Sequence, residues 1–121
     1  SVSSRPLILI AGDFNDYSQD SSIKLITERG MKEVSRKVVG THGARGTYRF
    51  HGEWGSLDHI FCNDFLAGKV NNCYINDTPF LLEEERKYGG VKPFRTFLGP
   101  HYLGGFSDHL PLVATFLIKM K

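Results

Sequence analysis

Apolar residues gather in short runs along the chain, separated by glycine, proline and small polar residues. Residues 5–11 contain a continuous apolar run, which favours a strand that is covered on both faces. Residues 57–62, 70–75 and 112–118 are rich in β-branched and aromatic side chains, as strands are, and residues 47–50 predict one more short strand. The pattern therefore predicts a protein built mainly of strands with few helices.

Two helices are expected between these strands. Residues 18–29 predict the first, because Ile23 and Ile26 lie three positions apart on one face and Gly30 fits the position just after the last turn. Residues 80–87 predict a second, shorter helix.

The remaining segments are expected to be turns and loops. Residues 52–55 predict a turn, and the glycine-rich residues 40–46 and 89–105 predict loops. Strands that alternate with few helices favour an α/β or α+β class. The 121 residues are enough for one small domain with one core.

Charge and cysteine content narrow the picture only slightly. The net charge of +2 permits a polyanionic partner such as nucleic acid, but dedicated nucleic-acid domains carry a higher, clustered charge. Apolar runs are too short for a membrane-spanning helix. Cys62 and Cys73 are too few for a disulfide framework, and we expect free, partly buried thiols. The chain starts at Ser1 without a signal peptide and reads as a piece of a longer protein, so the sequence leaves its compartment open.

Polar groups at the end of the first apolar run are candidates for chemistry. Asp13 and Asn15 lie two positions apart, so that their side chains could point the same way. Hydrolysis of a phosphate ester needs a positioned water and hard oxygen ligands for a cation such as Mg²⁺. Asp13 could orient the water, and Asn15 could donate to a phosphate oxygen. The plain alternative is a turn after a strand.

A second carboxylate lies inside an apolar strand. A period of two places Asp58 and Ile60 on one face, and His59 and Phe61 on the other. A carboxylate on a buried face needs a partner, and a histidine that it holds in one tautomer would serve. The alternative is an aspartate that faces water from an edge strand.

A third candidate group directly precedes the last strand. His109 is a candidate catalytic histidine, and Asp108 could position a metal or a water, with Ser107 supporting the turn. A capped turn with a solvent-facing histidine is the alternative. Tyr48 could stack against a substrate base, or it could pack in the core. The other histidines, His59 among them, are read as packed or surface residues.

Taken together and in this order, the motifs resemble the second half of the endonuclease/exonuclease/phosphatase superfamily. The motifs are Gly12-Asp13-Phe14-Asn15, Thr47-Tyr48, Leu57-Asp58-His59-Ile60-Phe61 and Gly105-Phe106-Ser107-Asp108-His109-Leu110-Pro111-Leu112. The stretch between residues 80 and 105 resembles a particular bacterial branch, whose members often look exported.

The resemblance implies a role for each matching residue. Asp13 corresponds to the aspartate that orients or deprotonates the attacking water, and Asn15 to its phosphate-contacting partner. Asp58 corresponds to the carboxylate that pairs with the catalytic histidine, here His109, and Asp108 to the aspartate near the metal. Mg²⁺ is the expected cation, with Mn²⁺ as an alternative.

The resemblance also implies that part of the domain lies elsewhere. Family members fold as a four-layer α/β/β/α sandwich of two similar halves, and the first half supplies a metal-binding glutamate. We therefore expect residues 1–121 to form the C-terminal half, one mixed β-sheet with helices on one face. The face that meets the other half would be uncovered and would favour self-association.

The sequence thus predicts a fragment of a Mg²⁺-dependent phosphodiesterase resembling nucleases, inactive or nearly so by itself. The expected partners are a phosphate-ester substrate, with nucleic acid as one candidate, and the missing N-terminal half. The same residues would serve a phosphomonoesterase or a lipid or inositol phosphate hydrolase. A non-catalytic binding module is a further alternative, although it has no evident need for Asp13, Asn15, Asp58 and His109 together.

Overall fold

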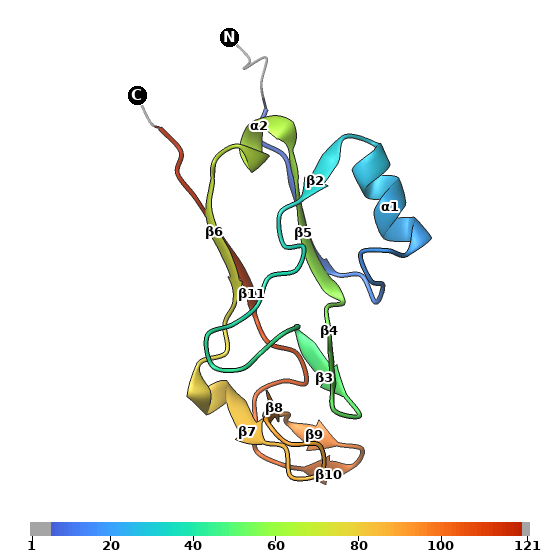
Figure 1. Cartoon of the computed structure of the whole chain (residues 1–121), viewed down its shortest axis with the longest axis vertical. Helices are drawn as coiled ribbons and strands as arrows, with labels where there is room; N and C mark the ends of the chain where they lie inside the picture. Colours follow the sequence, from blue (N-terminus) through green and yellow to red (C-terminus); the bar gives the residue numbers. More distant parts are fainter. Residues whose placement is uncertain (1–5, 120–121) are drawn as a thin grey trace. The chain divides into compact units, whose positions relative to one another are not determined.

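The protein is described by a computed structural model that covers residues 6–119, and the chain divides into two compact units (Figure 1). Unit 1 comprises the described residues up to Arg36, residues 57–73 and those from Ala114 onward. Unit 2 comprises residues 37–56 and 74–113. Each unit is described by itself.

Unit 1 contains a three-stranded antiparallel sheet with the order β1-β5-β2 (Figure 1). Its strands are β1 (Leu9–Asp13), β5 (Asp58–Asn63) and β2 (Met31–Glu33). The four residues from His59 to Cys62 are buried, because β5 is the central strand. The predicted strand at residues 57–62 is thereby confirmed, and its burial on both faces explains why its apolar run is continuous.

The helix predicted for residues 18–29 is present as α1 (Ser21–Glu28), with Ile23 fully buried. Asp20 is the N-cap residue, but its side chain does not cap the helix. Its carboxylate accepts the N–H of Tyr17 at 2.7 Å instead. Gly30 follows the helix with a φ of +94°, a conformation that glycine adopts without strain. A short helix, α2 (Asp64–Ala67), follows β5.

The interpretation of residues 5–11 as a strand covered on both faces is wrong for the part that the structure describes. The strand runs from Leu9 to Asp13, and all five of its residues are exposed. Leu9 alone is 46% exposed. β1 is an edge strand that pairs only with β5 within its sheet, so an apolar run here signals an uncovered face.

The strands expected at residues 70–75 and 112–118 are present as β6 (Val70–Ile75) and β11 (Leu112–Phe116), and they pair in a two-stranded sheet. Within unit 1, the N–H of Leu117 donates to the carbonyl of Lys69 at 2.9 Å. Within unit 2, the N–H of Asn76 donates to the carbonyl of Pro111 at 2.8 Å.

Unit 2 contains three β-hairpins. The strand pairs are β3 (Tyr48–Phe50) with β4 (Glu53–Gly55), β7 (Leu82–Glu84) with β8 (Val91–Pro93), and β9 (Phe97–Leu98) with β10 (His101–Tyr102). Arg49 in β3 joins the first two hairpins, because its guanidinium donates to the carbonyls of Gly89 at 2.7 Å and Val91 at 2.9 Å.

The core of unit 2 is a small apolar cluster of Ala44, Ile75 and Leu110. Partly buried hydrophobic residues pack around it: Val38, Trp54, Leu81, Leu82 and Leu112. The predicted turn at residues 52–55 is therefore wrong in part, since Glu53–Gly55 is a strand that places Trp54 against this core.

Two other expectations for unit 2 are also wrong. Residues 80–87 do not form a helix. A short 3₁₀ turn (Pro79–Leu81) is followed instead by β7. Residues 89–105 are not a plain loop, since they contain β8, β9 and β10.

The fold class is mixed, with helices and strands as expected. In place of one mixed sheet, the described residues form one three-stranded and four two-stranded sheets, mostly antiparallel. Three of the two-stranded sheets are hairpins of consecutive strands, whereas β1, β5 and β2 come from distant parts of the sequence. The four-layer sandwich stays a prediction.

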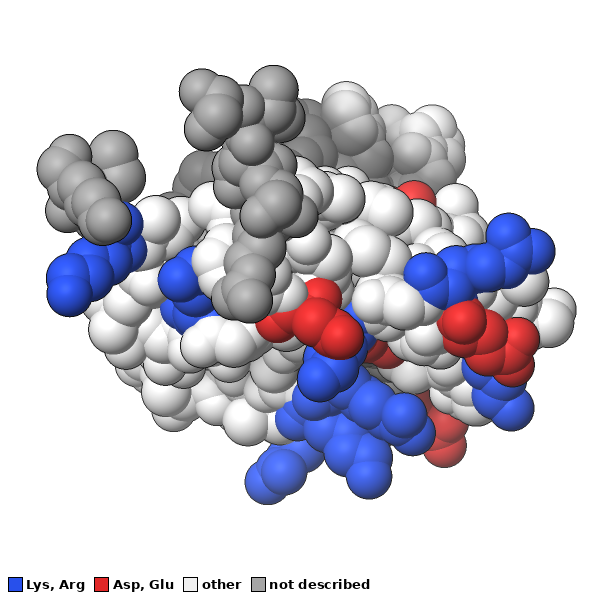
Figure 2. Space-filling model, turned by 90° about the horizontal axis from the view of Figure 1, so that it is seen from above, with Lys and Arg blue, Asp and Glu red and all other residues white. Residues whose placement is uncertain are grey.

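The thiols are free, as the sequence predicts, although Cys62 is more deeply buried than expected. On the face shown in Figure 2, Lys and Arg form one cluster at the lower centre and smaller groups elsewhere, with carboxylates beside several of them. Cys62 is buried and Cys73 half-buried, and neither forms a disulfide. Among the described residues, no helix has the length and apolar character that a membrane crossing requires.

Candidate active site

Two carboxylates meet at one end of the unit 1 sheet. Asp13 is the last residue of β1 and Asp58 the first of β5, and the antiparallel register places them opposite each other. A carboxylate oxygen of Asp13 lies within 4.8 Å of one of Asp58. Asp58 is half-buried at the start of β5, where that strand pairs with β1, so its side chain is less open to water than that of Asp13.

The turn after β1 presents Asp13 and Asn15. The N–H of Asn15 donates to Oδ1 of Asp13 at 2.9 Å, and Asn15 has a φ of +55°, which asparagine tolerates better than most residues. The N–H of Phe14 donates to the carbonyl of Leu57 at 2.9 Å. Asp13 and Asn15 therefore form a turn after the strand, as the plain alternative predicts. Asp13 also lies opposite Asp58 in a carboxylate pair.

A buried charged pair lies directly behind this turn. His59 Nδ1 lies 2.7 Å from Oε2 of Glu33, and His59 Nε2 lies 2.6 Å from the carbonyl oxygen of Asp16. A carboxylate and a carbonyl only accept hydrogen bonds. When Glu33 is ionised, both ring nitrogens of His59 donate, and this arrangement favours the imidazolium form of the ring.

The pKa values of the two groups shift as this pairing requires. Burial by itself lowers the pKa of His59, but the hydrogen bonds to Glu33 and to the Asp16 carbonyl outweigh it, and the pKa is raised. Burial raises the pKa of Glu33, but the hydrogen bonds from His59, Ser18 and Ser35 outweigh it, and the pKa is lowered. Both groups are thus held in their charged forms.

The other predicted site residues lie in unit 2. His109 forms an isolated antiparallel bridge with Tyr48, and their rings stack with centroids 5.7 Å apart. The N–H of His109 donates to Oγ of Ser107 at 3.1 Å, so that Ser107 supports the turn as expected. Asp108 is exposed and forms an ion pair of 3.4 Å with Arg95.

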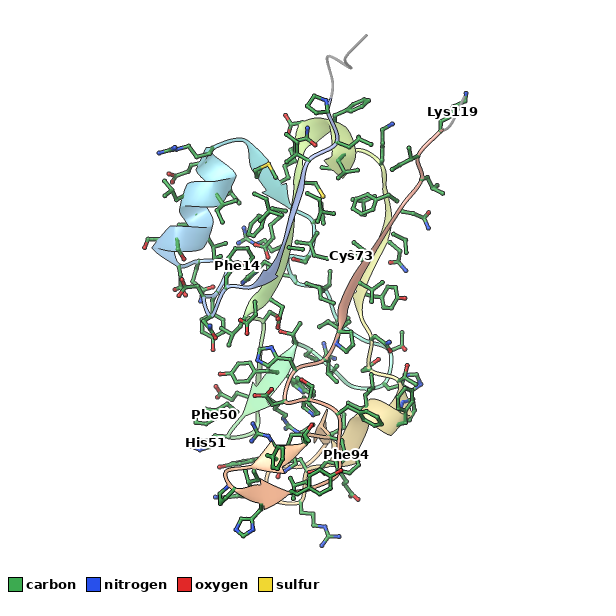
Figure 3. The ribbon with its side chains drawn as sticks, turned by 180° about the vertical axis from the view of Figure 1, so that it is seen from behind. Phe14, Phe50, His51, Cys73, Phe94 and Lys119 are labelled. Atoms are coloured by element: carbon green, nitrogen blue, oxygen red, sulfur yellow. The ribbon has the colours of Figure 1, made fainter. Side chains whose placement is uncertain are left out.

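A cavity of about 380 Å³ lies within unit 2, beside Tyr48 and Asp108. Its walls come from the three hairpins of this unit. Phe50 and His51, labelled in Figure 3, form one wall with stacked rings 4.0 Å apart. The charges of the other walls balance, since Lys92 contacts Glu83 and Glu85 and Arg95 contacts Asp108.

The structure therefore places the predicted residues in two groups. Asp13, Asn15 and Asp58 lie together in unit 1. Tyr48, Asp108 and His109 lie in unit 2. The pairing of Asp58 with His109 and the catalytic roles stay predictions.

Sequence reasoning missed one buried group. Glu33 drew no attention, and His59 was read as a packed or surface histidine. The available signal was that His59 shares a strand face with Phe61 in an apolar segment, where a buried polar ring needs a partner. The partner could not be named, because it lies 26 residues away on another strand.

The donor set at Asp13 and Asp58 fits a hard divalent cation. Two carboxylates within reach of each other supply oxygen ligands, and one of them is exposed. Mg²⁺ binds through one or two carboxylates and keeps several waters, which suits an open pair better than a closed cage. This chemistry agrees with the expected cation without distinguishing Mg²⁺ from Mn²⁺.

Comparison with known proteins supports the same reading. The profile of the Endonuclease/Exonuclease/phosphatase family matches residues 3–119. The chain therefore belongs to this family, as the motifs indicated, and its domain is of a hydrolase type that acts on phosphate esters. Comparison with curated proteins gives no match, and comparison with solved structures gives none either.

Proposed function

We propose that this chain carries part of the active site of a metal-dependent phosphodiesterase. The observation that carries the proposal is the pairing of Asp13 with Asp58 at one sheet end, with Asn15 in the adjoining turn. Asp13 orients the attacking water, and Asn15 donates to a phosphate oxygen. Family membership supports this assignment of chemistry.

His109 acts with Asp58 in the proposed mechanism. The carboxylate of Asp58 holds the imidazole in one tautomer, and the imidazole takes or orients a proton of the reacting groups. Asp108 lies next to His109 in sequence and contributes to positioning a metal or a water.

Asp13, Asp58 and Asp108 are the carboxylates of this chain that would hold or orient a cation, with Mg²⁺ preferred over Mn²⁺. When bound, such a cation neutralises charge at the phosphoryl oxygens and lowers the pKa of a water. These carboxylates supply hard oxygen ligands, which suit Mg²⁺ and Mn²⁺. None of the proposed ligands is a thiolate, which softer metals prefer.

A phosphodiester is favoured over a phosphomonoester by the cavity beside Tyr48 and Asp108. Its volume of about 380 Å³ can hold an organic group on the second ester oxygen, which a monoester lacks. Tyr48 would contact that group. The balanced charges of the walls support an uncharged group there and give no reason for a bare phosphate to bind.

The chain is proposed to be the C-terminal half of its domain and to need the other half for activity. The five exposed residues of β1, with an apolar Leu9 and Ile10, form an uncovered strand that a second sheet would bury. The first half would supply the further metal-binding glutamate that the family resemblance implies.

The test is hydrolysis of bis(p-nitrophenyl) phosphate with Mg²⁺ and with EDTA. The chain alone should give little or no turnover, and mixing it with the N-terminal half should restore Mg²⁺-dependent turnover. His109→Ala and Asp58→Asn should each lower that turnover at least about a hundredfold, as loss of a general acid–base group does. Asp64→Asn, which changes an exposed aspartate of α2, is the matched control and should leave it unchanged.

Each outcome decides one part of the proposal. Full activity of the chain alone would overturn the requirement for a second half. A mixture that stays inactive on phosphodiesters would count against the catalytic function and favour the non-catalytic module. Turnover of p-nitrophenyl phosphate in preference to the diester would favour a phosphomonoesterase.

A further inference from the structure

Two of the hydrogen bonds that support the turn formed by residues 13–16 lie at exposed positions: the N–H of Asn15 donates to Asp13, and the hydroxyl of Ser22 donates to the carboxylate of Asp16. Asp13 and Asn15 are exposed, and Phe14 and Asp16 are half-buried. Its internal hydrogen bond joins the N–H of Asn15 to Asp13 at an exposed position, where water competes for the same groups. A turn of this kind needs an external anchor to hold two functional side chains in one place.

That anchor is the buried ring of His59. Nε2 of His59 donates to the carbonyl of Asp16 at 2.6 Å, and this hydrogen bond fixes the end of the turn. The Phe14 ring packs on the same imidazole with centroids 5.8 Å apart, and edge-on against Phe61 at 5.5 Å. One side chain of the sheet therefore touches the turn both in its middle and at its end.

The His59 ring is in turn fixed by Glu33 on the neighbouring strand β2. The His59 side chain is 0% exposed and that of Glu33 6% exposed, so neither can exchange its partner for bulk water. Oε2 of Glu33 also accepts the hydroxyls of Ser18 at 3.1 Å and Ser35 at 3.3 Å. These donors fix the orientation of the carboxylate. The carboxylate in turn fixes the plane of the imidazole and favours its protonated form.

We propose that His59 and Glu33 are positioning residues, which hold the turn of residues 13–16 so that Asp13 and Asn15 face the reacting groups. The inference rests on the proposed function for the roles of Asp13 and Asn15. It adds two residues that would not touch the substrate, and that act through the Asp16 carbonyl and the Phe14 ring.

The rival explanation is that the pair only stabilises the core of unit 1. The two explanations differ in what loosens when the pair is broken. A core role predicts loss of protection throughout the unit, whereas a positioning role predicts loss confined to the turn.

The experiment uses Glu33→Gln in the full chain, which keeps the shape of the side chain and removes its charge. Amide hydrogen exchange is followed at Phe14, which donates to Leu57, and at Leu117, which donates to Lys69 in the same unit. Exchange at Phe14 should accelerate about tenfold or more, with Leu117 unchanged. Thr27→Ala is the control, because it removes a side-chain hydrogen bond of unit 1, from Thr27 Oγ1 to the carbonyl of Lys24, that involves neither Glu33 nor the turn.

The second readout is Mn²⁺ binding to the same variants by calorimetry. Loss of an outer partner of a metal site lowers metal affinity about tenfold to a hundredfold, so Glu33→Gln should weaken binding by that factor. Thr27→Ala should have little effect. If Glu33→Gln does not fold, Ser18→Ala removes one donor to the carboxylate and should give a smaller change in the same direction.

Equal acceleration at Phe14 and Leu117, or unchanged Mn²⁺ affinity with a loosened turn, would overturn the positioning role. These results are separable from the fate of the proposed function. An inactive reconstituted enzyme would contradict the proposed function, but the faster exchange at Phe14 in Glu33→Gln, with Leu117 unchanged, would still be observed. An active enzyme whose Glu33→Gln variant keeps its protection and its turnover would sink only this inference.

Discussion

Asp77 in unit 2 shows how one buried carboxylate can hold a loop. Its side chain accepts the N–H groups of Thr41 at 2.9 Å, His42 at 2.7 Å and Ala44 at 3.0 Å. Gly40 is required beside it, since a Cβ there would lie 2.2 Å from Cγ of Asp77. Burial raises the pKa of Asp77, but the backbone hydrogen bonds outweigh it and the pKa is lowered.

A pH-dependent contribution to stability follows from this lowered pKa. A carboxyl whose pKa is lower in the folded than in the unfolded chain stabilises the fold above its unfolded pKa, and this stabilisation is lost as the pH falls through the folded pKa. At pH 7, Asp77→Asn should lower the free energy of unfolding by about 2 kcal/mol, because charged hydrogen bonds are replaced by neutral ones.

Urea denaturation from pH 7 down to about pH 3 measures this difference. The gap between the wild type and Asp77→Asn should begin to narrow below about pH 4, where the unfolded wild-type carboxyl takes up a proton, and should keep narrowing as the pH falls through the lowered pKa of the folded carboxyl. A gap that stays constant across this range would show that the charge of Asp77 is not the cause.

Single residues of the candidate site differed in how far the sequence revealed them. Asp13 and Asp58 could be predicted, because each stands in a short motif next to an apolar run. The contact of Glu33 with His59 could not, since it depends on the pairing of β2 with β5 across 26 residues. Local patterns identify a polar residue on a buried face, but only the register of the sheet names its partner.

At the scale of elements, the β3–β4 hairpin depends on its two-residue turn. His51 has a φ of +49° and Gly52 a φ of +80°, the combination that suits a tight hairpin. The space at Gly52 is also filled, since a Cβ there would lie 2.5 Å from Cγ of Tyr88. Figure 3 labels Phe50 and His51 on this hairpin.

Gly52→Ala should therefore destabilise the protein more than a change of backbone conformation alone would. Gly89→Ala is the matched control, because Gly89 has a φ of +81° and open space around its Cα. Both variants bear the strain of a left-handed alanine, about 1 kcal/mol. Gly52→Ala should lose about 1–3 kcal/mol more, the range for overpacking, in thermal or urea unfolding. Equal losses would mean that Tyr88 moves aside freely.

The β7–β8 hairpin shows why an element was predicted wrongly. Leucine, glutamate, arginine and lysine dominate residues 82–87, and these residues have high helix propensity. Pairing with Val91–Pro93 overrides that propensity, with Lys92 lying 3.4 Å from Glu83 and 3.2 Å from Glu85. In other elements the local sequence pattern and the tertiary contacts favour the same structure. This agreement explains why the residues of β5, β6, β11 and α1 were predicted correctly.

At the scale of the whole molecule, the exposed β1 strand makes the chain prone to associate. A bare apolar edge pairs readily with another chain, and charged lysines on such edges prevent this. Sedimentation velocity over a range of concentrations should show self-association of the chain. Leu9→Lys should shift it toward the monomer.

Leu25→Lys is the control for this prediction. Leu25 lies on α1 and is 50% exposed, close to the 46% of Leu9, but it is not on a strand edge. It should leave association unchanged. A wild-type chain that stays monomeric at every concentration would contradict the prediction.

The family could be predicted from the sequence, whereas the arrangement of small sheets could not. Four motifs in order were enough to indicate the family, because three of them combine a strand end with residues suited to phosphate chemistry. Hairpins such as β9–β10 carry no alternating pattern, since two-residue strands are too short to show a period.

The two cysteines have a practical consequence for future work. Burial raises the pKa of both the Cys62 and the Cys73 thiols, so the reactive thiolate is scarce near neutral pH. A cysteine introduced at an exposed position would then react with a fluorescent or spin label much faster than either native thiol. Both native cysteines could then stay in place. Two such labels, one near Asp13 and one near His109, would measure the distance between the two groups of proposed site residues.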